Sequence, residues 1–329
     1  MYISVQYLRA FAAFLVLLSH IGYKLSMNGS DLIDQNFHVG GYGVDLFFII
    51  SGFIMCVTLD KKKPSLVLFL RDRILRIIPL YWFLTSFALL IYLLKPSLVN
   101  SSGGDTSIFT SFTLIPNGDK YLINNGWTLS FEFLFYFIFA LFIGVNLSVK
   151  KFTVAAILLL VFIGGTVDLD RPFLVFLFSP LLLEFAMGIL SYLIIKRFLL
   201  SGLISILLIV LSCVMLSFVN HGWKFDGHFA RVINGGLPMM FLFVGFVALE
   251  SKIKMFTTPY EIGMSSYSMY LIHPFVLAGV TFFVKYFSII HYNLLYGFLM
   301  FFMSFIIGWL CYFYVELNIN KYVRNKFIR

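Results

Sequence analysis

The chain has 329 residues, of which 60% are hydrophobic and 12% are charged, and its mean hydropathy is +0.95. Soluble domains carry about 45–50% apolar and about 25% charged residues, so this composition excludes a soluble enzyme, a disordered protein and a nucleic-acid-binding protein. We therefore attribute the net charge of +9 to basic cytoplasmic loops. The three cysteines all lie in apolar stretches, which indicates neither a disulfide framework nor a metal site.

Ten apolar segments follow one another along the chain, each close to the roughly 20 residues that a membrane-spanning helix needs. Lipid offers no partners to backbone polar groups, and the segments show no alternation, so each is predicted to be a helix. We expect an all-α polytopic membrane protein that forms a single domain over residues 1–329, without an appended soluble domain. The predicted spans are residues 7–24, 41–59, 74–94, 126–146, 152–167, 174–195, 201–219, 232–249, 263–287 and 293–316.

The lysines and arginines indicate how the spans are oriented. With the N-terminus in the cytoplasm, 16 of the 24 basic residues lie in cytoplasmic segments and 7 lie outside, while Arg9 lies near the cytoplasmic end of the first span. Cytoplasmic loops of membrane proteins are enriched in these residues, so both termini are predicted to be cytoplasmic. No basic region precedes the first apolar run, and we expect this span to be retained and not cleaved as a signal.

The largest external loop, residues 95–125, is rich in serine, glycine, asparagine and aspartate. It is polar enough to meet a hydrated substrate. An inert connector accounts for the same composition, and the sequence leaves both interpretations open.

Three ionisable side chains are predicted to share one depth in the outer half of the bilayer. At about 1.5 Å of rise per residue, His20 lies about 20 Å above the inner end of the first span, while Glu132 and Asp45 lie about 9 and 6 Å below the outer ends of theirs. Charges inside spans are costly and mark candidate functional sites. A histidine beside a carboxylate can act as a general base; a structural hydrogen-bond cluster between helices is the alternative.

Two further ionisable residues are second-tier candidates. His273 lies within the ninth span and precedes Pro274, which interrupts the helical hydrogen-bond ladder, and Glu184 lies within the sixth span. Each can line a cavity, or can serve packing and hydrogen bonding alone.

A cluster of arginines lies at the cytoplasmic end of the third span, in the segment RDRILRIIP. Arg73 and Arg76 are three residues apart and share a helix side, Arg71 is nearby, and Arg9 of the first span can join them. Guanidinium groups bind phosphate oxygens in a bidentate way, which makes the cluster a candidate phosphate site. An ordinary positive-inside anchor is the alternative.

Five segments, in this order, closely resemble motifs of the acyltransferase-3 family of integral membrane O-acyltransferases. Together they extend over nearly the whole chain, and the nearest likeness is to the branch that O-acetylates bacterial exopolysaccharide or O-antigen sugars. The segments are YLRAFAAFLVLLSH (7–20), GYGVDLFFIISGFIM (41–55), FLRDRILRIIPLYWFLT (69–85), GWTLSFEFLFYFIFAL (126–141) and SYSMYLIHPFVL (266–277).

The resemblance implies roles for the matching residues. The essential arginine and histidine of the first helix in that family match Arg9 and His20, and its donor-associated R-x-x-R matches Arg73 and Arg76. The acidic residue of the family's W-T-L-x-x-E motif matches Glu132. The family's SYxxYLxHP-like segment matches residues 266–274, which include Tyr270 and His273. These two residues and Arg71 of the third span are second-tier candidates.

The resemblance also implies the reaction: acetyl-CoA as cytoplasmic acyl donor, and a polysaccharide or lipid-linked oligosaccharide as external acceptor. It implies a place among the lipids of the bacterial inner membrane, with no metal and no nucleic-acid partner. Some members of the family carry a C-terminal esterase-like domain, whereas this sequence stops about 13 residues after the last predicted span. We expect the membrane domain to complete the transfer alone.

The sequence therefore yields a specific hypothesis. Arg73 and Arg76, with Arg9, hold the phosphates of acetyl-CoA, and His20 either deprotonates the acceptor hydroxyl or carries the acetyl group. Glu132 orients His20, and Asp45 positions the acceptor or is structural. A transporter of a lipid-linked sugar or small solute is the alternative, because many helices and buried charges suit that function as well.

Overall fold

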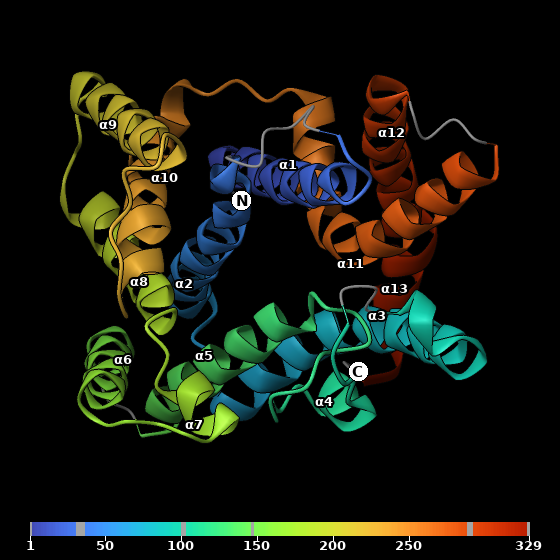
Figure 1. Cartoon of the computed structure of the whole chain (residues 1–329). Coiled ribbons are helices and arrows are strands. Elements are labelled where there is room, and N and C mark those ends of the chain that lie inside the picture. The colour runs from blue at the N-terminus through green and yellow to red at the C-terminus, as the bar shows by residue number, and fades with distance from the viewer. Residues whose placement is uncertain (1, 31–36, 100–102, 146–147, 288–291, 328–329) are drawn as a thin grey trace. The chain divides into compact units, whose positions relative to one another are not determined.

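The computed structural model describes residues 2–30, 37–99, 103–145, 148–287 and 292–327 (Figure 1). These residues are predominantly helical and form no strand, apart from one isolated bridge between Thr106 and Lys120. The helices are α1 (Ile3–Ser26), η1 (His38–Tyr42), α2 (Gly43–Lys62), α3 (Leu66–Leu94), η2 (Pro96–Leu98), α4 (Ile108–Thr113), α5 (Gly126–Gly144), α6 (Val149–Thr166), α7 (Pro172–Leu177), α8 (Leu182–Arg197), α9 (Gly202–Asn220), η3 (Val232–Gly236), α10 (Leu237–Ala248), η4 (Glu250–Lys252), α11 (Thr257–Tyr286), α12 (Asn293–Cys311), η5 (Tyr312–Glu316) and α13 (Leu317–Phe327).

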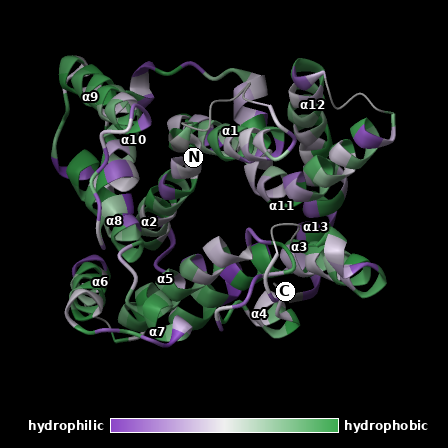
Figure 2. Ribbon diagram, in the orientation of Figure 1, coloured by the Kyte–Doolittle hydropathy of each residue, from purple (hydrophilic) through white to green (hydrophobic). Residues whose placement is uncertain are grey.

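All ten predicted spans coincide with helical segments. Within the described residues, nine helical stretches are long and apolar enough to cross a membrane, and the tenth, Val232–Ala248, is shorter. This short one begins with the π-helical turn η3 and continues as α10. Figure 2 shows hydrophobic residues along the length of these helices. The all-α polytopic fold is thus confirmed, while the cytoplasmic placement of both termini stays a prediction.

The chain forms two compact units, each assembled from separate stretches of sequence. Unit 1 comprises Met1–Phe53 and Met187–Phe313, and unit 2 comprises Ile54–Ala186 and Tyr314–Arg329. The boundaries fall inside α2, near the start of α8, and inside η5. That residues 1–329 act as a single functional domain stays a prediction.

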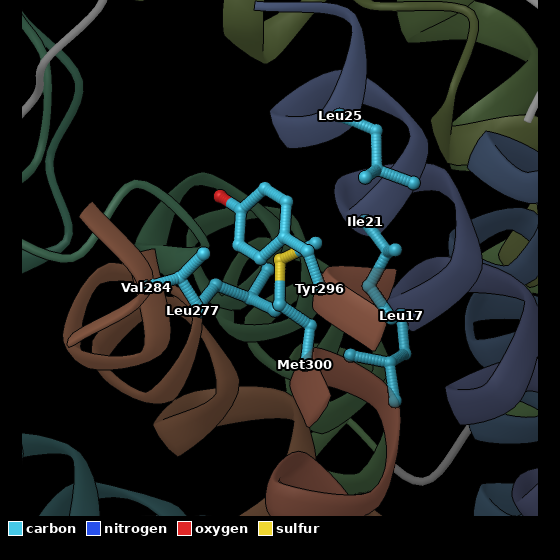
Figure 3. Close-up of a cluster of buried hydrophobic side chains, with 7 residues drawn as sticks. All are labelled: Leu17, Ile21, Leu25, Leu277, Val284, Tyr296 and Met300. Atoms are coloured by element: carbon cyan, nitrogen blue, oxygen red, sulfur yellow. The ribbon is translucent and has the colours of Figure 1, made fainter. Parts of the chain in front are cut away.

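Unit 1 is organised around the long helices α1 and α11. Helix α12 packs on α11, and α9 packs on α10. Seven buried side chains from α1, α11 and α12 form one core cluster, drawn in Figure 3. They are Leu17, Ile21, Leu25, Leu277, Val284, Tyr296 and Met300.

Glycines let the helices of unit 1 approach closely. A Cβ at Gly263 of α11 would lie 2.1 Å from the Gln6 carbonyl oxygen of α1, so only glycine fits there. Gly43, at the start of α2, also lies closely against the Ala12 carbonyl, where a Cβ would be 2.5 Å from the oxygen. Small residues at such crossings are the usual way in which membrane helices gain close packing.

In unit 2, α3 and α5 run antiparallel. Gly126 at the start of α5 lies beside the Tyr81 hydroxyl of α3, and Gly144 at its end lies beside Leu66 at the start of α3. Helix α6 packs on α5, while α4 and α13 pack on α3.

The predicted external loop is a folded element where the structure describes it, which leaves out residues 100–102. The Tyr81 hydroxyl donates to the Ser111 carbonyl at 2.6 Å, and the Trp82 indole donates to the Phe112 carbonyl at 2.9 Å, so α3 holds α4 in place. Tyr121 contacts the Ser130 hydroxyl at 2.7 Å, and burial raises the pKa of the Tyr121 phenol. These hydrogen bonds fix α4 and the following loop to α3 and α5.

Candidate functional site

A carboxylate holds the first turn of α1. Glu250 accepts hydrogen bonds from the backbone N–H groups of Ile3 at 2.7 Å and Ser4 at 2.8 Å. The first N–H groups of a helix lack partners inside it, and the positive end of its dipole favours a negative charge. The Tyr7 hydroxyl is bonded in turn to the backbone of Lys254 and Phe256. Helix α1 is thereby fixed to the segment that leads into α11.

The two histidines of the spans form a direct pair inside unit 1. His20 Nδ1 lies 2.7 Å from His273 Nε2, and the rings stack with centroids 4.9 Å apart and an interplanar angle of 24°. His273 Nδ1 lies 3.2 Å from the Met269 carbonyl oxygen, one turn earlier in α11. His273 is 2% exposed, whereas His20 is partly exposed. Of the two histidines, only His20 has appreciable exposed surface.

Aromatic side chains pack against the histidine pair. The Tyr270 ring centroid lies 6.0 Å from that of His273 and 5.9 Å from that of Phe47 on α2. Gly308 of α12 packs directly on Met269, where a Cβ would lie 2.9 Å from the Met269 Cα. The turn of α11 that carries both Tyr270 and His273 is therefore closely confined.

Asp45, in the first turn of α2, forms an ion pair with Arg231. The Arg231 guanidinium donates to both carboxylate oxygens, at 2.9 and 3.3 Å, and more weakly to the Gly41 carbonyl at 3.5 Å. The Asp45 side chain is fully buried, and that of Arg231 is 38% exposed. Next to Arg231, Gly235 packs against the ring of Tyr42. The ion pair therefore joins the start of α2 to η3.

Glu132 belongs to a polar network in unit 2. It accepts a hydrogen bond from the Tyr136 hydroxyl one turn later on α5. Arg73 of α3 interacts electrostatically with Glu132 and Tyr136, and its guanidinium lies 6.0 Å from the centroid of the Phe69 ring. Antiparallel packing of α3 and α5 brings these side chains to one level.

The arginines of the third span differ in burial. Arg73 is buried at 9% exposure, and no hydrogen-bond partner of its Nε atom lies among the described residues. Arg76 is exposed, and Arg71 pairs with its neighbour Asp72 at 3.4 Å. Positions three apart are about 60° apart around a helix, so one can face the protein while the other faces outward.

The structure regroups the predicted site residues. His20 is paired with His273, Asp45 with Arg231, and Glu132 with Tyr136 and Arg73. His20 and Glu132 belong to different units, as do Arg9 and the arginines of α3, so those two predicted groupings stay predictions. The partly buried Arg9 lies on α1, eleven residues before His20.

The sequence pattern indicates neither the pairing of His20 with His273 nor the ion pair of Arg231 with Asp45. A depth comparison offered a signal for the histidines: both predicted spans ascend, with His273 about 15 Å and His20 about 20 Å above their inner ends. The part of the chain that the structure describes contains no group of three His, Cys, Asp or Glu side chains suited to hold a metal ion.

Comparison with known proteins identifies the family. The acyltransferase domain family matches residues 2–313. The chain belongs to this acyltransferase family. The matched region includes both histidines, the Asp45–Arg231 pair and the arginines of α3. The resemblance noted from the five sequence motifs is thereby confirmed.

The chain is also similar to the exopolysaccharide production protein ExoZ of Rhizobium meliloti (strain 1021). The two chains are 32% identical over 261 residues, which cover 75% of this acyltransferase and 79% of ExoZ. No solved structure matches the chain.

Proposed function

We propose that this protein is an O-acetyltransferase of the bacterial inner membrane. It moves an acetyl group from cytoplasmic acetyl-CoA to a hydroxyl of an exopolysaccharide sugar, or of its lipid-linked precursor, on the external side. Membership of the acyltransferase family and similarity to an exopolysaccharide production protein support this reaction. The observation that carries the proposal is the partly exposed imidazole of His20, held by a buried partner in α11.

His20 acts as the general base. It takes the proton of the acceptor hydroxyl as the hydroxyl oxygen attacks the thioester carbonyl. The new C–O bond forms, the C–S bond breaks, and the proton passes from His20 to the departing thiolate of CoA. General-base assistance of this kind contributes roughly 10²–10⁴-fold to rate.

The donor site lies at the arginines of α3. Arg76 is exposed and binds a phosphate of acetyl-CoA, whereas the buried Arg73 shapes this site through its interaction with Glu132. Family membership favours acyl transfer over the transporter interpretation.

The test uses purified protein in lipid nanodiscs, radiolabelled acetyl-CoA and the polysaccharide fraction of cells that lack the gene. The wild type transfers label, and His20→Ala loses at least about a hundredfold in rate. His221→Ala is the control, because it removes an exposed imidazole at the end of α9 whose ring contacts the Ser217 carbonyl and not another histidine. Undiminished transfer by His20→Ala would remove His20 from the mechanism, and no transfer by the wild type would refute the proposed reaction.

A further inference from the structure

The buried histidine of α11 has a chemical role of its own. We propose that His273 is a positioning residue that fixes the tautomer of His20, so that His20 Nε2 carries the lone pair needed for general-base catalysis. This inference rests on the proposed function, and it assigns His273 no contact with the substrate.

The first step concerns the proton on His273. A carbonyl oxygen can only accept a hydrogen bond, so the contact between His273 Nδ1 and the Met269 carbonyl requires a proton on Nδ1. A ring that is 2% exposed is neutral unless its charge is paired, because burying an unpaired charge is costly. Neutral His273 with its proton on Nδ1 has a lone pair on Nε2.

The residue after His273 strengthens this arrangement. Pro274 has no backbone N–H, so the Tyr270 carbonyl, four residues earlier, loses its usual helical donor. The Tyr270 carbonyl, one residue after that of Met269 in the same turn, therefore has no helical N–H donor at position 274. The His-Pro sequence thus supplies the imidazole of His273 and leaves the Tyr270 carbonyl without its helical donor. Such a carbonyl nearby favours a proton on His273 Nδ1.

The second step concerns His20. Because His273 Nε2 is an acceptor, the 2.7 Å contact requires a proton on His20 Nδ1. Neutral His20 then has its lone pair on Nε2, and within the described residues its ring has no hydrogen-bond partner except His273. The partly exposed ring therefore presents a basic nitrogen to the acceptor hydroxyl.

The same contact serves the reaction itself. When His20 Nε2 gains the hydroxyl proton, the ring becomes an imidazolium whose Nδ1–H still donates to His273, and that hydrogen bond becomes charge-assisted. A neutral partner orients the base as the carboxylate does in a serine protease triad, but adds no negative charge. Burial of His273 excludes it as the base, since no acceptor can reach it.

One experiment reads the tautomers directly. Protein with ¹⁵N-labelled histidine contains only six such residues, and His20→Gln and His273→Gln identify the two resonance pairs in lipid bilayers. We expect both rings to be neutral, with protonated Nδ1 and unprotonated Nε2. A proton on Nε2 of His20 or of His273 overturns the proposal. This measurement needs no activity, so a wild type with the expected tautomers that transfers no acetyl would refute the proposed function alone.

A second measurement separates positioning from simple packing. The amide of His273→Gln reaches the place of Nε2 and keeps an acceptor there, whereas the shorter amide of His273→Asn reaches only the place of Nδ1. We expect His273→Gln to stay within about tenfold of the wild-type kcat and His273→Asn to fall by about 10²–10³-fold, with KM for acetyl-CoA unchanged in both. His221→Gln is the control, and gel filtration checks that each variant is folded. Equal activity of the two His273 variants would overturn the positioning role.

Discussion

The Asp45–Arg231 ion pair makes an asymmetric prediction, because its two members differ in burial. Arg231→Ala leaves the Asp45 carboxylate fully buried without its guanidinium, and uncompensated buried charges of this kind cost about 3–5 kcal/mol. Asp45→Asn instead leaves the 38% exposed guanidinium, which water can reach. It loses a charged hydrogen-bond pair worth about 1.5–3 kcal/mol, at the lower end because of that exposure. Arg231→Ala is therefore expected to lower the free energy of unfolding by about 2 kcal/mol more than Asp45→Asn does.

Thermal unfolding in detergent micelles, followed by tryptophan fluorescence, measures the difference. At about 2 °C per kcal/mol, Arg231→Ala should unfold about 4 °C below Asp45→Asn. The double variant Asp45→Asn/Arg231→Ala should be more stable than the sum of the two losses predicts, since it retains neither charge. Equal losses, or a greater loss for Asp45→Asn, would refute the assignment of Asp45 as the desolvated partner.

Three further variants test the packing, the helix cap and the donor site. Gly263→Ala should push α1 away from α11, because the new Cβ would lie 2.1 Å from the Gln6 carbonyl oxygen. We expect the rate of acetyl transfer to fall at least tenfold. Gly279→Ala on the same helix meets open space, so this control should leave the rate nearly unchanged. Glu250→Gln weakens the two bonds at the start of α1 and should lower stability by about 1–2 kcal/mol, measured by thermal unfolding. Arg76→Ala should raise KM for acetyl-CoA several-fold without lowering the unfolding temperature, whereas an equal rise for Arg71→Ala would speak against a specific phosphate site.

Hydrophobic patterning predicted the helices well, since lipid leaves a continuous apolar segment no alternative to a helix. The eighth span shows where patterning alone falls short. Its apolar run covers residues 232–249, yet η3 forms a π-helical turn there, and Gly235 within that turn packs against the ring of Tyr42. A close contact between distant residues leaves no trace in local hydropathy.

The side-chain partners were less predictable than the helices. The familiar partner of a histidine general base is a carboxylate, so the depths of Asp45 and Glu132 predict a partner for His20 that differs from His273. Burial of Arg73 and exposure of Arg76 depend on which side of α3 meets α5, and a three-residue spacing does not specify that side. Arg231 was equally hidden, since a lone basic residue near a span end resembles an ordinary loop cation.

The separation of His20 and His273 by 253 positions has a consequence for biosynthesis. At about 5–20 residues per second, the ribosome adds His273 roughly 13–50 seconds after His20. During that interval α1 cannot yet pack on α11 at Gly263. For most of it, the Glu250 carboxylate that bonds the first turn of α1 is also still missing. The pair is therefore among the last contacts that translation permits, and a ribosome that stalls before α11 leaves a nascent chain without its histidine pair.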